Sequence, residues 1–165
     1  MAAPRVVYDC MVFLQGIVGS EDGPAAACLR LVEERQVQLL LSPSTLAELT
    51  DVLSRPKLRL KFPAITDEIE SAFLHHLVSI AETLPDPARV FALPRDPGDE
   101  PYLNLAIEGE ARFLVSWNQR HLNYLMTDDA PEAKDFRARY PELQIVTPPE
   151  FLEAMRNAAS EGEGA

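Results

Sequence analysis

The sequence predicts a three-layer α/β domain, with a central and mostly parallel sheet flanked by helices. Short β-prone runs alternate with longer segments in which apolar residues recur at helical spacing. Strands that alternate with helices favour right-handed crossovers, which place the strands parallel to one another in one sheet. The 165 residues suffice for one domain with a sizeable hydrophobic core and are too few for two.

Four segments are predicted to be strands because they are short, apolar and rich in β-branched or aromatic residues. Beyond the first of them the chain remains apolar through residues 11–14, so that Asp9 interrupts an apolar run. A buried carboxylate needs a partner, and this makes Asp9 a candidate for function. The four predicted strands are residues 5–8, 37–41, 112–116 and 144–147.

The predicted helices are identified by apolar spacing and by proline in the first turn. Arg55-Pro56 ends the second of them. The third is the longest and carries Phe73, Leu77 and Leu84 on its apolar face before Pro85 ends it. The helices are expected to begin at Pro24, Pro43, Thr66, near Tyr102 and at Pro148, the last running through Met155.

The ends of the chain and its cysteines indicate the kind of protein. We expect residues 1–156 to form the domain and residues 157–165 to be a flexible acidic tail. No apolar run approaches the roughly 18 residues that span a bilayer, and no secretion signal is visible, so no membrane partner is expected. Cys10 and Cys28 lie among apolar residues and are expected to be reduced thiols in a cytoplasmic protein.

The charge balance restricts the ways in which the chain could meet a nucleic acid. There are 15 Lys and Arg against 26 Asp and Glu, a net charge of -11. This argues against a broad basic surface for non-specific nucleic-acid binding. It does not exclude a nuclease that reaches phosphate through a metal ion, because carboxylates that hold the ion add to the acidic count.

Four oxygen-bearing side chains are predicted to lie where the carboxyl ends of the strands meet. In open α/β sheets this edge is where ligands bind. A group of carboxylates without Lys or His is unstable unless cations compensate it, and it suits Mg²⁺ or Mn²⁺. The candidates are Asp9 after the first strand, Glu48 in the helix after the second, Asp99 before the third and Asn118 after it.

Each candidate also has a structural interpretation. Asp9 could cap a turn, Asp99 could cap the helix opened by Pro101, and Asn118 is a common turn residue. Glu48 could be solvated or could close a capping box with Thr45. Asp96 and Glu100 are expected to be supporting or solvated residues.

Six segments, taken in chain order, resemble the PIN-domain ribonucleases, and in particular the toxin components of prokaryotic toxin–antitoxin pairs. The resemblance covers nearly the whole chain, and its specificity comes from the ordered set of segments. They are residues 6–13, 41–48, 52–57, 95–99, 114–118 and 145–152.

The resemblance implies metal-dependent hydrolysis of RNA at an acidic cluster that holds one or two Mg²⁺ or Mn²⁺ ions. Carried over to this chain, it gives Asp9, Glu48 and Asp99 as the catalytic and metal-binding acids. The implied partners are an RNA substrate, a cognate antitoxin protein and a second copy of the chain. The long helix with Phe73 and Leu77 could serve such a homodimer, although core burial explains these residues equally well.

Two positions depart from the family pattern. Met11 stands where the family usually has Asn, and Asn118 stands in place of a fourth acid. Asn118 still offers a carbonyl oxygen to a metal or its water, but it removes one negative charge. The alternative function is therefore a catalytically weak or inactive PIN fold that acts as a binding module. A small-molecule phosphohydrolase is less favoured, because a cap domain and a phosphate-binding Lys are missing from the sequence.

Overall fold

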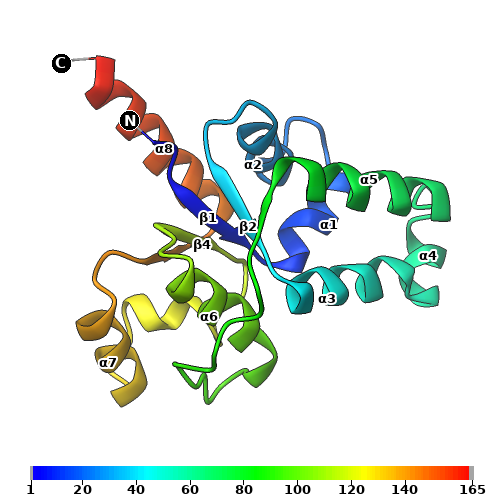
Figure 1. Ribbon diagram of the computed structural model, residues 1–165. Helices are drawn as coiled ribbons and strands as arrows, with labels where there is room; N and C mark the ends of the chain where they lie inside the picture. Colours follow the sequence, from blue (N-terminus) through cyan, green and yellow to red (C-terminus); the bar gives the residue numbers. More distant parts are fainter. Residues whose placement is uncertain (1, 164–165) are drawn as a thin grey trace.

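The middle layer of the computed structural model is a five-stranded parallel sheet with the strand order β3-β2-β1-β4-β5 (Figure 1). The structure describes residues 2–163. This arrangement confirms the predicted three-layer α/β class. The strands are β1 (Arg5–Tyr8), β2 (Gln38–Leu41), β3 (Glu82–Thr83), β4 (Phe113–Val115) and β5 (Gln144–Val146).

Helices cover both faces of the sheet. The first five helices and α8 contribute to the core on one face, whereas α6 and α7 pack on the other. Two short 3-10 segments, at Pro97–Asp99 and Asn123–Met126, connect elements of the second face. The helices are α1 (Cys10–Val18), α2 (Pro24–Glu33), α3 (Pro43–Ser54), α4 (Pro56–Lys61), α5 (Asp67–Ile80), α6 (Glu100–Glu108), α7 (Pro131–Arg139) and α8 (Pro148–Glu163).

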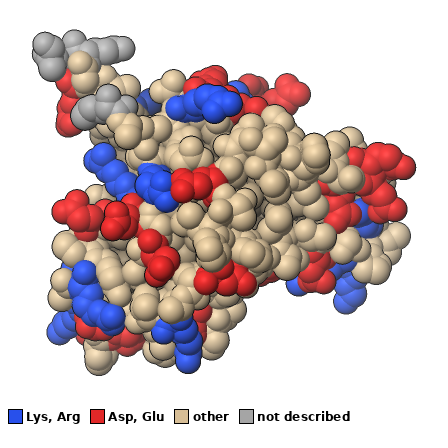
Figure 2. Space-filling model, in the orientation of Figure 1, with Lys and Arg blue, Asp and Glu red and all other residues tan. Residues whose placement is uncertain are grey.

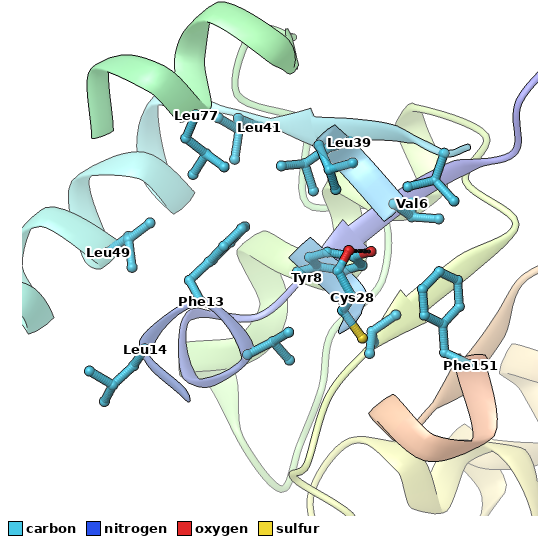
Figure 3. Close-up of a cluster of buried hydrophobic side chains, with 14 of the residues drawn as sticks. Val6, Tyr8, Phe13, Leu14, Cys28, Leu39, Leu41, Leu49, Leu77 and Phe151 are labelled. Carbon is cyan, nitrogen blue, oxygen red and sulfur yellow. Dashed lines mark hydrogen bonds between the residues drawn. The ribbon is translucent and has the colours of Figure 1, made fainter. Parts of the chain in front are cut away.

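Alternation along the strands divides the core into two clusters. Val6 and Tyr8 of β1 face one cluster, and Val7 faces the other. Figure 3 shows the first cluster, in which Tyr8 packs against Phe13 of α1 and Phe151 of α8. Burial of each such side chain stabilises the fold by roughly 1.5–3 kcal/mol. These contacts anchor α1 at the carboxyl end of β1.

The apolar residues 11–14 lie in helix α1, and the chain leaves the sheet at Asp9. Val12, Phe13 and Leu14 are all buried, because α1 contacts both α2 and α3. A helix covered on several sides lacks a polar stripe, which explains why the sequence reads as an uninterrupted apolar run.

Three other elements differ from the sequence prediction. The long helix α5 ends at Ile80 rather than near Leu84, and the next residues form the edge strand β3 beside β2. Pro56, expected only to end a helix, is also the first residue of the short helix α4. Helix α7 was not predicted, because only Ala133 and Phe136 of its residues are buried and its apolar pattern is weak.

Several remaining expectations concern α5, α8 and the cysteines. Leu77 is buried and Phe73 packs edge-on against Phe13, so the core interpretation accounts for both residues. Helix α8 continues through residues 157–163, whereas residues 164–165 lie outside the described part of the chain; a flexible tail stays a prediction. Cys10 and Cys28 are free thiols. Within residues 2–163, none of the helices has the length and apolar character needed to cross a membrane.

Candidate functional site

The candidate residues lie at the edge of the sheet where the carboxyl ends of β1, β2 and β4 meet. Because these strands are parallel, the segments that follow them share this edge. Asp9 follows β1, one residue separates β2 from α3, and Ser116 and Asn118 follow β4. The loop before α6 reaches the same edge and supplies Asp96 and Asp99.

Asp9 is buried, with 6% of its surface exposed, and it is the N-cap of α1. Its Oδ1 accepts a hydrogen bond from the Val12 N–H at 3.1 Å, so the capping interpretation is correct. Burial raises the pKa of Asp9, and the negative charge of Glu48 raises it further. Hydrogen bonds from Ser116 and from the α1 backbone act in the opposite direction. Asp9 therefore caps a helix and also faces a second carboxylate.

Asp99 stands at the N-cap position of α6 without capping it. Its Oδ2 accepts a hydrogen bond from Asn118 Nδ2 at 2.7 Å, and the same Nδ2 lies 3.0 Å from Asp96 Oδ2. Burial raises the pKa of Asp99 to about 6, and the charges of Asp96, Asp9 and Glu48 contribute to the rise. The capping interpretation of Asp99 is therefore wrong.

Asn118 presents its NH₂ group to the carboxylates, not the carbonyl oxygen that the sequence analysis expected. A carboxylate can only accept, so an amide placed between Asp96 and Asp99 must direct its donors toward them. The amide thus provides hydrogen bonds where a fourth acid would have added a negative charge.

Glu48 lies one turn into α3 and is half-buried. The capping box of α3 joins Ser42 and Thr45, so the box predicted between Thr45 and Glu48 does not form. The Glu48 carboxylate is left free for the site, where its charge raises the pKa of both Asp9 and Asp99. The structure therefore brings together the four residues that the sequence analysis selected.

Glu100, although adjacent to Asp99, belongs to a different environment. Its carboxylate forms a two-pronged ion pair with the Arg89 guanidinium, with N–O distances of 2.7–2.9 Å. The hydrogen bonds from Arg89 hold the pKa of Glu100 below its usual range. Glu100 is thus a structural residue, neither solvated nor part of the acidic group.

Ser116 is a site residue that the sequence analysis missed. It is fully buried at the end of β4, and its Oγ accepts a hydrogen bond from the Asn118 N–H at 3.0 Å. Its hydroxyl also bonds to Asp9 and lowers the pKa of that acid. The position of a polar residue directly after a buried strand could have indicated Ser116 as a site residue. Ser116 connects Asp9 with Asn118.

The donor chemistry of the site fits a hard divalent cation. Asp9, Glu48 and Asp99 take part in none of the ion pairs formed by the described residues. Unneutralised carboxylates are the ligands that Mg²⁺ and Mn²⁺ prefer. No three His, Cys, Asp or Glu side chains within residues 2–163 are arranged to hold an ion as they stand. From this edge the acids would hold an ion after a side-chain rotation or through bridging water molecules.

The molecular surface agrees with the acidic character of the chain. Figure 2 shows Lys and Arg in small separate groups with Asp and Glu between them, on the face that it presents. Several Arg side chains of the described residues are paired with carboxylates, as Arg5 is with Glu82. This face offers no continuous basic strip for a phosphate backbone.

Comparison with known proteins identifies the family. A family profile described as PIN domain matches residues 5–120. The chain belongs to the PIN domain family. PIN domains are in general nucleases, and the matched range includes all the site residues described above. The toxin branch stays a prediction.

The fold of this PIN domain is also similar to a solved structure. The crystal structure of PAE2754 from Pyrobaculum aerophilum matches with a TM-score of 0.53 and 16% sequence identity. The match covers 95% of this chain and 92% of that protein. At this identity the likeness supports the fold alone. No curated protein matches the sequence.

Proposed function

We propose that this PIN domain is an endoribonuclease that depends on Mg²⁺ or Mn²⁺ and uses Asp9, Glu48 and Asp99. The observation that supports this most is electrostatic. Three carboxylates from distant parts of the chain lie close enough for their charges to interact, and the pKa values of Asp9 and Asp99 are raised. Such an arrangement costs free energy in the folded protein, and perturbed carboxylates of this kind are typical of functional sites.

In the proposed reaction, Asp9 and Asp99 would hold the ion, directly or through water, with Glu48 completing the acidic set. When bound, the ion would supply a Lewis acid for a phosphate oxygen and a more acidic water as nucleophile. The Ser116 hydroxyl and the Val12 N–H fix the orientation of the Asp9 carboxylate. Asn118 orients Asp99 by donating to its Oδ2.

The decisive experiment is cleavage of a single-stranded RNA with Mn²⁺ or with EDTA. We expect cleavage by the wild type only with the metal, and a loss of about 100-fold or more in Glu48→Gln. The control is Glu68→Gln, which removes an exposed carboxylate from α5 and should cleave like the wild type. Cleavage that persists in EDTA, or equal loss in both variants, would exclude the proposed mechanism.

The alternative is a PIN-fold binding module with little or no activity. Two observations favour it: the Asn118 amide donates to two of the acids, and Met11 beside Asp9 is an exposed apolar residue. Metal binding by the wild type without RNA cleavage would select this alternative. A gain of cleavage in Asn118→Asp would then show that the missing fourth acid is the reason.

We further propose that the nuclease is the toxin of a toxin–antitoxin pair in the cytoplasm. The support is the resemblance of residues 52–57 and 145–152 to that branch. Induced expression of the wild type in a bacterial host should arrest growth, whereas expression of Glu48→Gln should not. The same proposal includes a homodimer and a complex with an antitoxin protein. Light scattering of the purified chain tests the homodimer.

A further inference from the structure

Tyr102 is a buried tyrosine of α6 whose hydroxyl lacks a hydrogen-bond partner. Only 1% of its surface is exposed, and among the described residues the hydroxyl oxygen makes no hydrogen bond of normal geometry, although Glu48 and Cys10 lie close to it. Buried hydroxyl groups are nearly always paired, because an unpaired one loses its hydration without compensation. The exception therefore needs an explanation.

The surroundings of this hydroxyl lead back to the acidic site. Burial raises the pKa of Tyr102, and the nearby Cys10 thiol and Glu48 carboxylate raise it further. The Cys10 Sγ lies 3.9 Å from Glu48 Oε1. Burial also raises the pKa of Cys10 to about 12, so the thiol is neutral at physiological pH. Two uncharged donors thus lie beside the same carboxylate.

Two other buried tyrosines show what the fold ordinarily provides. The Tyr8 hydroxyl donates to the Cys28 carbonyl oxygen at 2.9 Å, as Figure 3 shows. The Tyr124 hydroxyl bonds to Glu132 Oε1 at 2.8 Å. Tyr102 differs from both in that the acceptor beside it, Glu48, is a candidate ligand.

We propose that Tyr102 is a positioning residue, whose hydroxyl donates to the Glu48 carboxylate when Glu48 turns toward Asp9 and Asp99. This inference rests on the proposed metal-dependent function of the same site. One Glu48 oxygen would be held by Tyr102, and the other would remain free for the ion. A neutral donor suits this role better than Lys or Arg, because it orients the carboxylate without neutralising the charge that attracts the cation.

The test is Tyr102→Phe, which keeps the ring in the core and removes only the hydroxyl. We expect the melting temperature in EDTA to be unchanged or raised, because an unpaired polar atom is removed. We expect the Mn²⁺ affinity, measured by calorimetry, to fall about 10-fold. With RNA, kcat should fall more than KM rises, since the hydroxyl does not touch the substrate.

Tyr124→Phe is the matched control. It removes the hydroxyl that is bonded to Glu132, so it should lower the melting temperature and leave the Mn²⁺ affinity unchanged. Equal Mn²⁺ affinity in the wild type and Tyr102→Phe would overturn the inference alone. A lower melting temperature of Tyr102→Phe in EDTA would also overturn it, by showing a structural hydroxyl. A wild type that binds no Mn²⁺ would instead overturn the proposed function together with this role of Tyr102.

Discussion

Asp99 and Glu100 are consecutive acids at the start of α6, and their surroundings are opposite. Glu100 is buried and held by two prongs of the Arg89 guanidinium, whose hydrogen bonds lower its pKa. The pKa of Asp99 is raised to about 6 by burial and by the charges of Asp96, Asp9 and Glu48. The hydrogen bond from Asn118 opposes this rise and leaves Asp99 with a neutral donor instead of a cation.

The difference teaches how a functional carboxylate can be distinguished from a structural one. Burial does not separate the two acids, because Glu100 is more buried than Asp99. The partner separates them: the fold supplies a cation to Glu100 and three further carboxylates to Asp99. Like charges gathered at one site raise the pKa values of its carboxylates, and such perturbed carboxylates are candidates for function.

The largest effect is expected for Asp9→Asn, which removes one charge from the Asp99 group. RNA cleavage with Mn²⁺ should fall by about 100-fold or more. Asn is as good an N-cap as Asp and can still accept from the Val12 N–H, so the helix end is preserved. Stability in EDTA should be equal or higher by up to about 1 kcal/mol, because a buried carboxylate beside Glu48 is neutralised.

Thermal melts with EDTA and with Mn²⁺ check this prediction. The wild type should be stabilised by Mn²⁺ through mass action, and Asp9→Asn much less so. Asp22→Asn is the control, because Asp22 is exposed in the loop between α1 and α2. If Asp9→Asn is clearly less stable than the wild type in EDTA, Asp9 is a structural residue and belongs with Glu100.

The second effect concerns Asn118→Asp, which replaces the neutral donor beside Asp99 by a fourth carboxylate. Its Mn²⁺ affinity should rise by about 10-fold, since hard cations respond to the charge of their ligands. In EDTA the variant should be less stable at neutral pH, because a new charge faces Asp96 and Asp99 without the former hydrogen bonds. Calorimetric titration with equal or weaker affinity would remove Asn118 from the site.

Much of the fold could be predicted from the sequence, because buried parallel strands are short apolar runs separated by helices. The four predicted strands overlap β1, β2, β4 and β5. Strand β3 could not be predicted, since two residues carry no period and its pairing depends on β2. Helix α1 could not be predicted, because a helix buried on several sides lacks the amphipathic pattern that identifies a helix in a sequence.

The acids of the site could be predicted because they follow strands whose carboxyl ends share an edge. The orientation of Asn118 could not, since which end of an amide faces the site depends on acids elsewhere in the chain. A helix near Tyr102 could be predicted, and the ring of this residue is buried in α6. The direction of its hydroxyl toward Cys10 and Glu48 follows from how α6 packs, and the sequence does not encode that locally.

The third effect is a difference in pH dependence between Asp99→Asn and Glu100→Gln. The folded pKa of Asp99, about 6, lies above the usual value of about 4, so the folded state binds more protons between these values. Asp99 therefore lowers stability as pH rises from about 4 to about 6. The pKa of Glu100 is lowered, so its contribution is present above about 4.3 and is lost as pH falls further.

Urea unfolding in EDTA between about pH 4 and pH 7 measures both variants over this window. Asp99→Asn should be more stable than the wild type at pH 7, with a gap that closes toward pH 4. Glu100→Gln should be less stable than the wild type at pH 7, because the hydrogen-bonded ion pair between the buried Glu100 carboxylate and the exposed Arg89 guanidinium is broken. If both variants are more stable than the wild type at pH 7, or both are less stable, the contrast between the neighbouring acids does not hold.

The smallest effect is expected for Met11→Asn, which restores the residue that the resemblance leads us to expect beside the first acid. Met11 is 42% exposed in the first turn of α1. Asp9 already accepts hydrogen bonds from the Val12 N–H and from Ser116, so a further amide has little to satisfy. The free energy of unfolding should change by no more than about 0.5 kcal/mol, and the Mn²⁺ affinity by less than about threefold, far below Asn118→Asp. If Met11→Asn raises the Mn²⁺ affinity more than Asn118→Asp does, the surroundings of Asp9, and not those of Asp99, limit metal binding.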